Sequence, residues 1–283
     1  KNNMNNAWRI VETEPLDADE NMALDEAIFN CFCDTPAALP VFRIYQWDSP
    51  AFSIGASQIP GRHLDLRKCR SYGISCVRRM TGGGIIFHDR EITYSLVIPK
   101  AFYGLPKEVA ASFKKICEFI MIFYRRLGLS PAFAVGQPYG GFIGEPAEFC
   151  FAGREKYDIV IGGKKIGGNA QKRCQKAVFQ HGSIPLSIDR KRIAEFTLGE
   201  CAKELSGATA LNELSSHLVS QEELISLLKE SFIEAFSVSK TENFLKKEEL
   251  LLARKLKKEK YSNDAWNIER ITDAKSPEKA GVA

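Results

Sequence analysis

The sequence lacks the features that would place it in a membrane or on nucleic acid. No stretch approaches the roughly 18 apolar residues that a membrane span needs, and the opening residues KNNMNNAWRI have no apolar run like that of a signal peptide. The 39 Lys and Arg against 35 Asp and Glu give a net charge of +4, which is too mild for a nucleic-acid binder. We therefore expect a cytoplasmic protein without a membrane or nucleic-acid partner, while an acidic protein partner stays open.

The sequence also lacks the short motifs of nucleotide-binding and zinc proteins. It contains neither G-x-G-x-x-G nor G-x-x-x-x-G-K-[ST], the two common phosphate-binding fingerprints. Its eight cysteines, at 31, 33, 69, 76, 117, 150, 174 and 201, include no C-x-x-C pair, which argues against a metal site. In a reducing compartment most scattered thiols are small buried hydrophobes, so a catalytic role for any one of them needs local evidence.

What the chain does have is an ordinary globular composition, with 45% hydrophobic, 26% charged and 10% aromatic residues in 283 positions. This length suits one large α/β domain, or one domain with a small appendage. Because chain ends are often frayed, we expect a single domain over residues 1–270 and a flexible tail over residues 271–283.

Hydrophobic periodicity predicts several helices. Residues 19–33 have apolar residues at helical spacing behind a possible Asp19 cap. A long helix is predicted over residues 106–127, with Gly128 as its stop. Further helical stretches are expected near residues 189–198, 220–236 and 242–260.

Short β-rich runs predict the strands of one sheet. VFRIYQW and AFSIGAS are split by DSP and predict two strands joined by a turn, and ISCVRRM and GIIFHDREITYSLVIP lie on either side of three glycines. KYDIVIGGKKIGGNAQ predicts strand, Gly162–Gly163 turn and strand, and KAVFQHGSIPLSI predicts one more strand. Together with the helices, these runs favour an α/β fold with a mixed sheet flanked by helices.

The stretch RRMTGGGIIFHD, residues 78–89, is the first candidate for chemistry. Its three glycines remove every Cβ, so the backbone can approach a ligand closely and its amides can point at an oxyanion or a phosphate. A plain glycine turn between two strands explains the same letters. The flanking arginines and His88 favour an anionic or carbonyl-bearing ligand.

Cys150 and Lys165 form the second candidate. A free thiol has a pKa of about 8.5. A neighbouring ammonium lowers this pKa, so the thiolate would be the resting nucleophile. If the strands of the hairpin pair, Lys165 folds back along the residues after Cys150, and because side chains alternate along a strand, Lys164 faces the other way. Phe149 and Phe151 flank Cys150, so the local sequence also fits a buried core residue. His181 and Ser183 in QHGSI are candidates for ligand binding or for a structural role.

Five strings in this order resemble the lipoate-protein ligase and octanoyltransferase superfamily, which is related to the biotin protein ligases. They are NMALDEA, RRMTGGGIIFHD, GGKKIGGNAQKR, QHGSIPL and KYSNDAWN, and they run through nearly the whole chain. The resemblance implies a mixed sheet flanked by helices, with an acyl chain held in a tunnel beside the glycine loop. Cys150 followed by Lys165 is most similar to the cysteine-dependent octanoyltransferases.

This resemblance implies a two-step acyl transfer without a cofactor. The donor would be octanoyl acyl carrier protein, Cys150 would take the octanoyl group as a thioester, and the acceptor would be a lysine of a lipoyl domain or of the glycine-cleavage H protein. Lys165 would hold the thiolate and then take a proton from the incoming amine. The expected protein is a monomer. Substrate binding would fall to Arg79, Thr81, Gly82, Gly83, Gly84, His88, Gly168, Ala170, His181 and Ser183.

Other activities on the same fold stay open. The loop TGGGIIFHD is closer to the ligase form than to the transferase form, which keeps an ATP- and magnesium-dependent lipoate-protein ligase as the alternative. An octanoyl amidotransferase would use the same cysteine and lysine. A non-catalytic module that binds octanoyl carrier protein is a third alternative, which the presence of both Cys150 and Lys165 disfavours.

Overall fold

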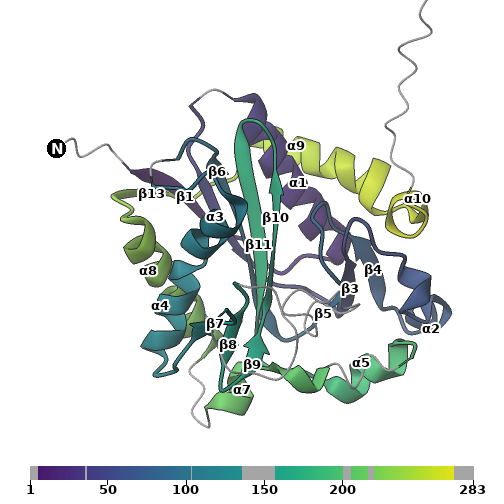
Figure 1. Cartoon of the computed structure of the whole chain (residues 1–283). Helices are drawn as coiled ribbons and strands as arrows, with labels where there is room; N and C mark the ends of the chain where they lie inside the picture. Colours follow the sequence, from purple (N-terminus) through teal and green to yellow (C-terminus); the bar gives the residue numbers. More distant parts are fainter. Residues whose placement is uncertain are drawn as a thin grey trace, which may run out of the picture.

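The computed structural model describes residues 6–35, 37–102, 104–135, 157–199, 205–215 and 220–270. Its centre is a mixed six-stranded sheet with the order β10-β11-β6-β2-β1-β13 (Figure 1). The strands β1, β2 and β13 run parallel, and the remaining pairs are antiparallel. Their bounds are β1 Ala7–Glu12, β2 Val41–Tyr45, β6 Glu91–Pro99, β10 Gly168–Arg173, β11 Ala177–Pro185 and β13 Lys240–Glu242.

Two smaller sheets accompany the central one, so the prediction of a single sheet is wrong. The first has the order β4-β3-β5 and the second the order β12-β9-β8-β7. Consequently the strands predicted from VFRIYQW and AFSIGAS do not pair with each other, because they belong to different sheets. The bounds are β3 Ala51–Ile54, β4 Ser75–Arg78, β5 Ile86–His88, β7 Ala132–Phe133, β8 Ile159–Ile161, β9 Lys164–Ile166 and β12 Ala208–Thr209.

Helices cover both faces of the central sheet. Helices α4 (Glu118–Arg126) and α8 (Gln221–Phe236) pack together on one face, while α1 (Ala18–Asp34) and α9 (Lys247–Leu256) pack together on the other (Figure 1). The described part also contains shorter α-helices, which are α2 Leu66–Ser71, α3 Val109–Ile116, α5 Arg190–Phe196, α7 Leu211–Leu214 and α10 Asp264–Asn267, and two 3-10 turns, Pro60–Arg62 and Leu205–Gly207. The predicted helices near 189–198, 220–236 and 242–260 are confirmed as α5, α8 and α9, the last continuing into a π-helical turn, Lys257–Tyr261.

Successive side chains of a strand point to opposite faces. One face of the central sheet is apolar under α4 and α8, whereas the face under α1 is apolar around Val41, Val97 and Phe179 and polar farther along the same strands. Phe42 of β2 is fully buried in the cluster under α4 and α8, where its ring stacks on Phe232 at 3.9 Å. Truncating such a ring to alanine costs about 3–5 kcal/mol. The neighbours Arg43 and Tyr45 instead face α1, where both contact Asp25. The polar part of the sheet is therefore buried beneath α1.

Two expectations about the helices are corrected by the structure. Asp17, and not Asp19, caps α1, because its side chain accepts the amide of Glu20 at 2.7 Å. The single helix expected over 106–127 is two helices, α3 and α4, which meet at Cys117.

The hairpin predicted from KYDIVIGGKKIGGNAQ, residues 156–171, forms, with Gly162 and Gly163 both at positive φ in its turn. Its second strand, however, is split in two at Gly167. This residue has φ +73, and a Cβ there would lie 2.0 Å from the carbonyl oxygen of Ser183. The backbone is thus pressed against β11, and the chain leaves one sheet as β9 and enters the other as β10.

Some expectations concern residues outside the described ranges. Cys150, with Phe149 and Phe151, is among them, and so is the tail over 271–283. Within the described residues, no helix has the length and the apolar character needed to cross a membrane.

Candidate active site

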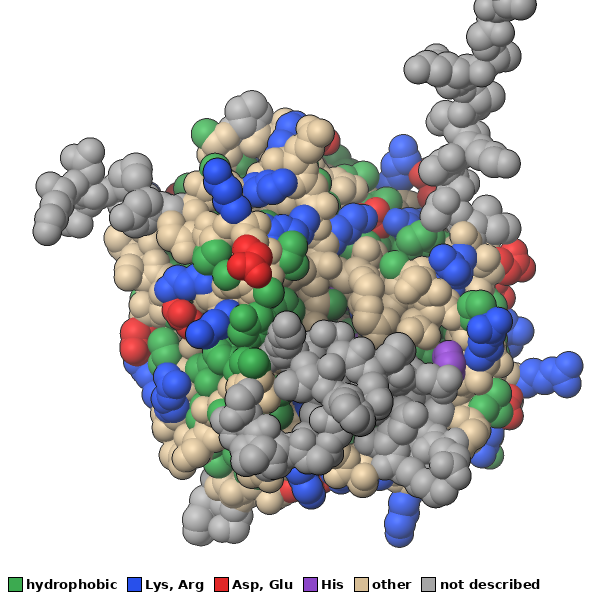
Figure 2. Space-filling view, viewed as in Figure 1, with side chains coloured by type: hydrophobic (Ala, Val, Ile, Leu, Met, Phe, Trp, Pro, Cys, Tyr) green, Lys and Arg blue, Asp and Glu red, His purple; other side chains and the backbone are tan. Residues whose placement is uncertain are grey.

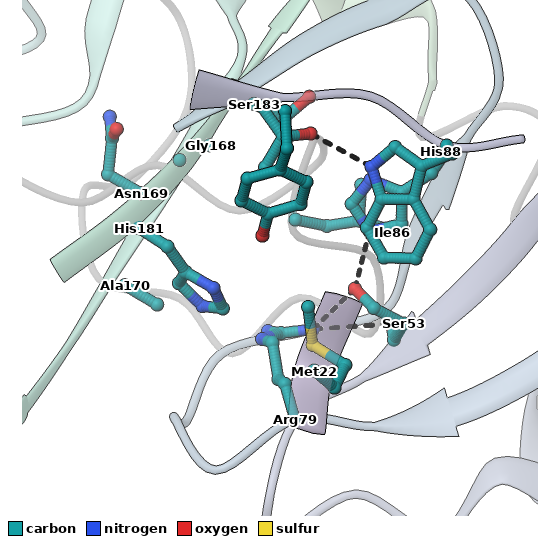
Figure 3. A pocket seen from close by; sticks show the side chains of 14 residues that line it. Met22, Ser53, Arg79, Ile86, His88, Gly168, Asn169, Ala170, His181 and Ser183 are labelled. Atoms are coloured by element: carbon teal, nitrogen blue, oxygen red, sulfur yellow. Dashed lines mark hydrogen bonds between the residues drawn. The ribbon is translucent and has the colours of Figure 1, made fainter. Parts of the chain in front are cut away.

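A cavity opens at the polar part of the central sheet, where α1, β10 and β11 meet the small sheet of β3, β4 and β5 (Figure 3). Of the residues predicted for substrate binding, Arg79, His88, Gly168, Ala170, His181 and Ser183 line it. They come from β10 and β11 of the central sheet and from β5 and the end of β4 in the small sheet, so the meeting of these two sheets brings them together.

Strand register explains why these polar groups meet. His181 of β11 pairs with Ser95 of β6, and Ser95 pairs with Arg43 of β2. The next row on the same face contains Ser183, Thr93 and Tyr45. Directly paired residues of neighbouring strands point to the same face. The sheet therefore carries two adjacent rows of polar side chains on one face, and from them His181, Ser183, Thr93 and Tyr45 line the cavity.

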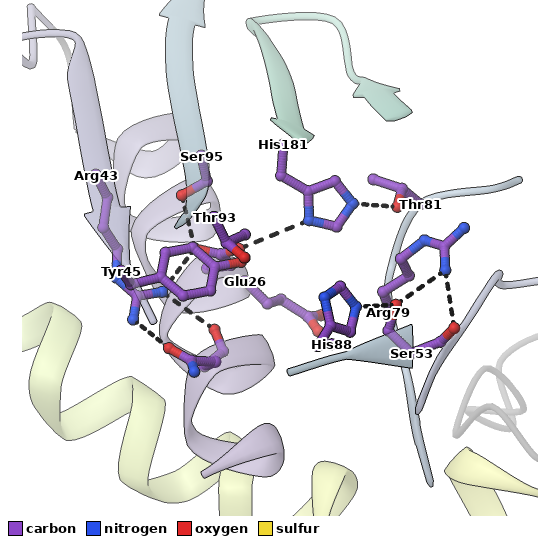
Figure 4. A network of polar contacts seen from close by, with 12 residues as sticks. Glu26, Arg43, Tyr45, Ser53, Arg79, Thr81, His88, Thr93, Ser95 and His181 are labelled. Carbon is purple, nitrogen blue, oxygen red and sulfur yellow. Dashed lines mark hydrogen bonds and ion pairs between the residues drawn. The ribbon is translucent and has the colours of Figure 1, made fainter. Parts of the chain in front are cut away.

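Asp25 of α1 contacts all three residues of the first row, Arg43, Ser95 and His181, which Figure 4 labels. Its carboxylate accepts hydrogen bonds from Arg43 at 2.8 Å, from Tyr45 at 2.9 Å and from Ser95 at 2.7 Å. Burial raises the pKa of this carboxyl, but the Arg43 charge, the nearby His181 and the hydrogen bond from Ser95 outweigh burial, and the pKa is lowered. Asp25 is therefore a buried carboxylate that stays charged at neutral pH.

His181 connects this network to the glycine loop. Its Nδ1 lies 3.8 Å from Asp25 Oδ2, and its Nε2 lies 2.7 Å from the hydroxyl of Thr81, the residue before the three glycines. Burial lowers the pKa of His181, and the nearby Asp25 only partly opposes this effect. A neutral imidazole at pH 7 can accept a hydrogen bond or donate one, depending on its tautomer.

His88 forms a second polar cluster on the same cavity. Its Nδ1 is 2.7 Å from Glu91 and its Nε2 is 2.7 Å from the hydroxyl of Ser53, while its ring stacks on Trp47 at 3.9 Å. The other oxygen of Glu91 accepts the hydroxyl of Ser183 at 2.6 Å. Burial raises the pKa of Glu91, but His88 and the hydroxyl donors outweigh burial, and the pKa is lowered.

Arg79 fixes the glycine loop from inside. Its guanidinium donates to the carbonyls of Gly82 at 2.8 Å and Gly84 at 2.7 Å, and to the backbone and hydroxyl oxygens of Ser53. Gly55 packs against the loop so closely that a Cβ there would lie 1.9 Å from the carbonyl oxygen of Gly83. The loop is therefore held by contacts on both sides. Gly82 and Gly83 are exposed, and the three loop glycines are not among the described residues that line the cavity.

Arg78, the other arginine of the RR pair, has a separate, structural environment. It is fully buried, and its guanidinium donates to the carbonyls of Gln58, Trp266 and Asn267, while the side chain of Asn267 accepts the amide of Arg78. Burial lowers its pKa to about 10. The string KYSNDAWN near the end of the chain thus fastens α10 to β4 beside the glycine loop.

Lys165 lies on β9, and its ammonium forms a buried ion pair with Asp158 at 2.7 Å. Both side chains are less than 5% exposed, whereas Lys164 is exposed, as the alternation along the strand predicts. Lys165 does not belong to the described lining of the cavity. Asp158 is thus a charged partner that holds this lysine in a fixed place.

Sequence reasoning missed the acidic partners of this site. Asp25 lies within the string NMALDEA, which was quoted as a motif without a role, and Glu91 follows His88 by three positions. Asp158 comes shortly before Lys165 in the hairpin. The available signal was a charged residue beside apolar residues. Such a residue can be buried, and a buried charge needs a partner.

Comparison with known proteins agrees with the resemblance. The family described as the lipoyl protein ligase A/B catalytic domain matches residues 17–233. An octanoyltransferase LipM of an Exiguobacterium species is 34% identical over 92% of this chain and 97% of its own length, and that of Brevibacillus brevis is 31% identical over 93% and 99%. The LipM of Bacillus subtilis is 30% identical over 93% of this chain and 98% of its own length.

Solved structures show the same fold. A putative lipoate protein ligase from T. acidophilum with bound lipoic acid superposes with a TM-score of 0.78 at 24% identity, over 93% of this chain and 99% of that one. A lipoate-protein ligase A bound with ATP gives 0.77 at 24% identity, over 94% and 100%. These structures confirm the predicted α/β fold. The LipM relatives confirm the predicted class of enzyme. The chain belongs to the lipoyl protein ligase A/B catalytic-domain family, and within it to the LipM octanoyltransferases, which are acyltransferases.

Proposed function

We propose that this chain moves an octanoyl group from the thioester of an acyl carrier protein to a lysine ε-amine of a lipoyl domain or of the glycine-cleavage H protein. The observation that carries the proposal is the likeness to LipM octanoyltransferases over more than nine-tenths of the chain. A partner of the lipoyl-domain class is further supported by a related archaeal lipoate ligase that is described together with its E2 lipoyl domain.

In the first step, the thiolate of Cys150 attacks the carbonyl carbon of the donor thioester. The bond to the carrier's sulfur breaks, the Lys165 ammonium gives a proton to the departing thiolate, and a Cys150 thioester remains. One thioester replaces another, so this step is close to neutral in free energy. The pair of Lys165 and Asp158 supports this role, since it holds an ammonium in a buried place before the reaction begins.

In the second step, the acceptor amine attacks the Cys150 thioester. Lys165, now neutral, takes a proton from the amine, the carbon–sulfur bond breaks, and the thiolate of Cys150 is restored beside an ammonium. The product is an amide, which is more stable than a thioester, so the reaction needs no ATP. No cofactor enters either step.

The cavity is the proposed place for the octanoyl chain and its carbonyl. Met22, Trp47 and Ile86 offer apolar surface for the chain. Arg79, His88, Gly168, Ala170, His181 and Ser183 line the same space and are the proposed polar or close-approach contacts. Thr81 acts on this wall through His181. The amides of Gly82, Gly83 and Gly84 remain the proposed donors to the acyl oxygen as charge develops on it.

The surface fits an acidic carrier protein as donor. Figure 2 shows Lys and Arg side chains spread over the face seen in Figure 1, with acidic side chains between them, and the chain has a net charge of +4. Opposite charge on the partner speeds encounter more than it strengthens the final complex. A cytoplasmic location and a monomeric state belong to this proposal.

Intact-mass measurement after incubation with octanoyl carrier protein, without ATP, tests the proposal. The protein should gain the mass of one octanoyl group and pass it to an added lipoyl domain. Cys150→Ala should gain nothing, while the matched variant Cys31→Ala should behave like the parent.

The ligase alternative makes the opposite prediction for the same experiment. Modification of the lipoyl domain would require ATP, magnesium and free lipoate or octanoate, and Cys150→Ala would keep its activity. Either result would overturn the cysteine route.

A further inference from the structure

Two cysteines that the proposed reaction does not use lie side by side near the surface. Cys33 is in the last turn of α1 and Cys174 is in the turn between β10 and β11, 141 positions later. Their sulfur atoms are 3.3 Å apart, and both residues are partly exposed. Reacting thiols need this proximity, since a disulfide places its sulfurs about 2.05 Å apart.

The surroundings of the two sulfurs differ in a way that assigns them different roles. Cys174 Sγ accepts the backbone amides of Lys176 at 3.4 Å and Ala177 at 3.2 Å, which stabilise negative charge on it. Burial raises the pKa of Cys174, but the hydrogen bond from Cys33 and these amides outweigh burial, and the pKa is lowered. Burial and the Cys174 sulfur raise the pKa of Cys33 to about 12. Two backbone amides thus favour negative charge on Cys174, while Cys33 is the sulfur of the pair that keeps its proton.

Cys33 lines a surface hollow of about 360 Å³ together with Phe32, Pro99 and Lys176, and the adjacent Cys174 is itself partly exposed. The ammonium of Lys176 donates to the Cys33 carbonyl at 2.7 Å, so a positive charge lies at the edge of the pair. A solvent-accessible cysteine whose negative charge is favoured, with a second thiol beside it, is the usual arrangement of cysteines that respond to peroxide.

We propose that Cys33 and Cys174 form a peroxide-sensitive dithiol whose disulfide fastens the end of α1 to the β10–β11 turn. The Cys174 thiolate attacks one oxygen of hydrogen peroxide, the O–O bond breaks, hydroxide leaves, and a sulfenic acid forms. The sulfur of Cys33 then attacks this sulfenic sulfur, its proton leaves with the hydroxyl group as water, and the S–S bond forms. Overall, two thiols and one peroxide give one disulfide and two waters. A small dithiol reductant restores both thiols by exchange.

The position of the disulfide connects it to the candidate site. α1 carries Met22 and Asp25, and β11 carries His181, so the bond joins the two elements that build one wall of the cavity. It closes a long loop of chain, which restricts the unfolded state and stabilises the folded one. We therefore expect the oxidised protein to melt several degrees higher than the reduced protein.

The test is a titration of the intact chain with hydrogen peroxide, followed by non-reducing peptide mapping. The expected product is a peptide containing Cys33 linked to one containing Cys174, with the loss of two hydrogens and reversal by dithiothreitol. Cys33→Ser should stop at the sulfenic acid of Cys174 and lose the rise in melting temperature. Cys174→Ser should give no product at this pair, and Cys31→Ser, two residues from Cys33, should form the link as the parent does.

Two results would overturn the proposal. One is a linked peptide that joins either cysteine to a different partner while the other stays reduced. The other is an unmodified Cys174 at peroxide concentrations that oxidise ordinary exposed thiols. Because the readout is a mass and a melting temperature, the outcome does not depend on acyl transfer.

Discussion

His88 and His181 line the same cavity, and each lies between a carboxylate and a hydroxyl. The two clusters differ in how close the histidine is to its carboxylate and in whether that carboxylate has another cationic partner. His88 is 2.7 Å from Glu91, whereas His181 is 3.8 Å from Asp25. Asp25 has Arg43 as a cationic partner, but within the described part of the chain no Lys or Arg pairs with Glu91. The comparison indicates that the buried charge of Glu91 depends on His88, whereas the buried charge of Asp25 is stabilised by Arg43 and does not depend on His181.

The largest loss of stability should come from removing Arg43, the cation that pairs with Asp25. Arg43→Ala leaves a carboxylate buried without its partner, and we expect a loss of about 4 kcal/mol in the free energy of unfolding, measured in urea. The control is Arg70→Ala, since Arg70 and Asp264 form a pair with side chains 74% and 64% exposed. That pair should contribute less than about 1 kcal/mol. Equal losses in both variants would contradict the role of Arg43.

The next prediction compares the loss of stability caused by removing each histidine. His88→Ala removes the close partner of Glu91 and should destabilise the protein by about 3 kcal/mol, whereas His181→Ala should cost about 1 kcal/mol because Asp25 keeps Arg43. Urea unfolding of both variants side by side measures the difference. If the two losses are equal, or if His181 costs more, the comparison above is wrong.

The pair of Asp158 and Lys165 offers a buried charge pair outside both clusters. Asp158→Asn keeps the shape but removes the charge that favours the ammonium, so the pKa of Lys165 should fall. We expect kcat for octanoyl transfer to drop roughly tenfold or more, with the pH optimum moved to lower pH. The exposed neighbour gives the control, Lys164→Met, which should keep the parent profile. A loss in the asparagine variant that is the same at every pH would point to a purely structural role.

The smallest effect should appear in the pH dependence of stability. The pKa values of Asp25, Glu91 and His181 are all lowered from their ordinary values of 3.8, 4.5 and 6.5, so at low pH the unfolded state binds more protons than the folded state. Their contribution to stability is present at neutral pH and is lost as the pH falls. The urea midpoint should decline gently below pH 6.5 through His181 and more steeply below pH 4.5 through the two carboxyls. His181→Ala should flatten only the gentle part, and an unchanged slope there would contradict the assignment.

Much of the architecture could be predicted from the sequence because it depends on local pattern. The hairpin around Gly162 and Gly163 and the helices α5, α8 and α9 follow from turn chemistry and periodicity. The division into three sheets could not be predicted, because a β-rich run in the sequence does not show which other strand it pairs with. The break at Gly167 has the same cause, because only the approach of the Ser183 carbonyl shows why the chain must change sheets there.

The candidate site was also predicted only in part from the sequence. Arg79, His88, His181 and Ser183 were predicted from motifs, and the structure brings them to one cavity. Their acidic partners were not predicted, because an isolated Asp or Glu in a sequence has the same letter whether it is exposed or buried. The fold decided that Arg79 holds the carbonyls of the glycine loop. Cys150 stays a prediction, outside the described residues.

By itself, the sequence determined the family, the class of fold and the residue types available for chemistry, because motifs and hydrophobic periods are local properties of the chain. Only the tertiary structure decided which carboxylate serves which histidine, that Asp158 pairs with Lys165, and that Cys33 meets Cys174. These facts depend on contacts between residues that strand register and helix packing bring together. Electrostatic interactions fall off with distance in space, and separation along the chain does not fix that distance.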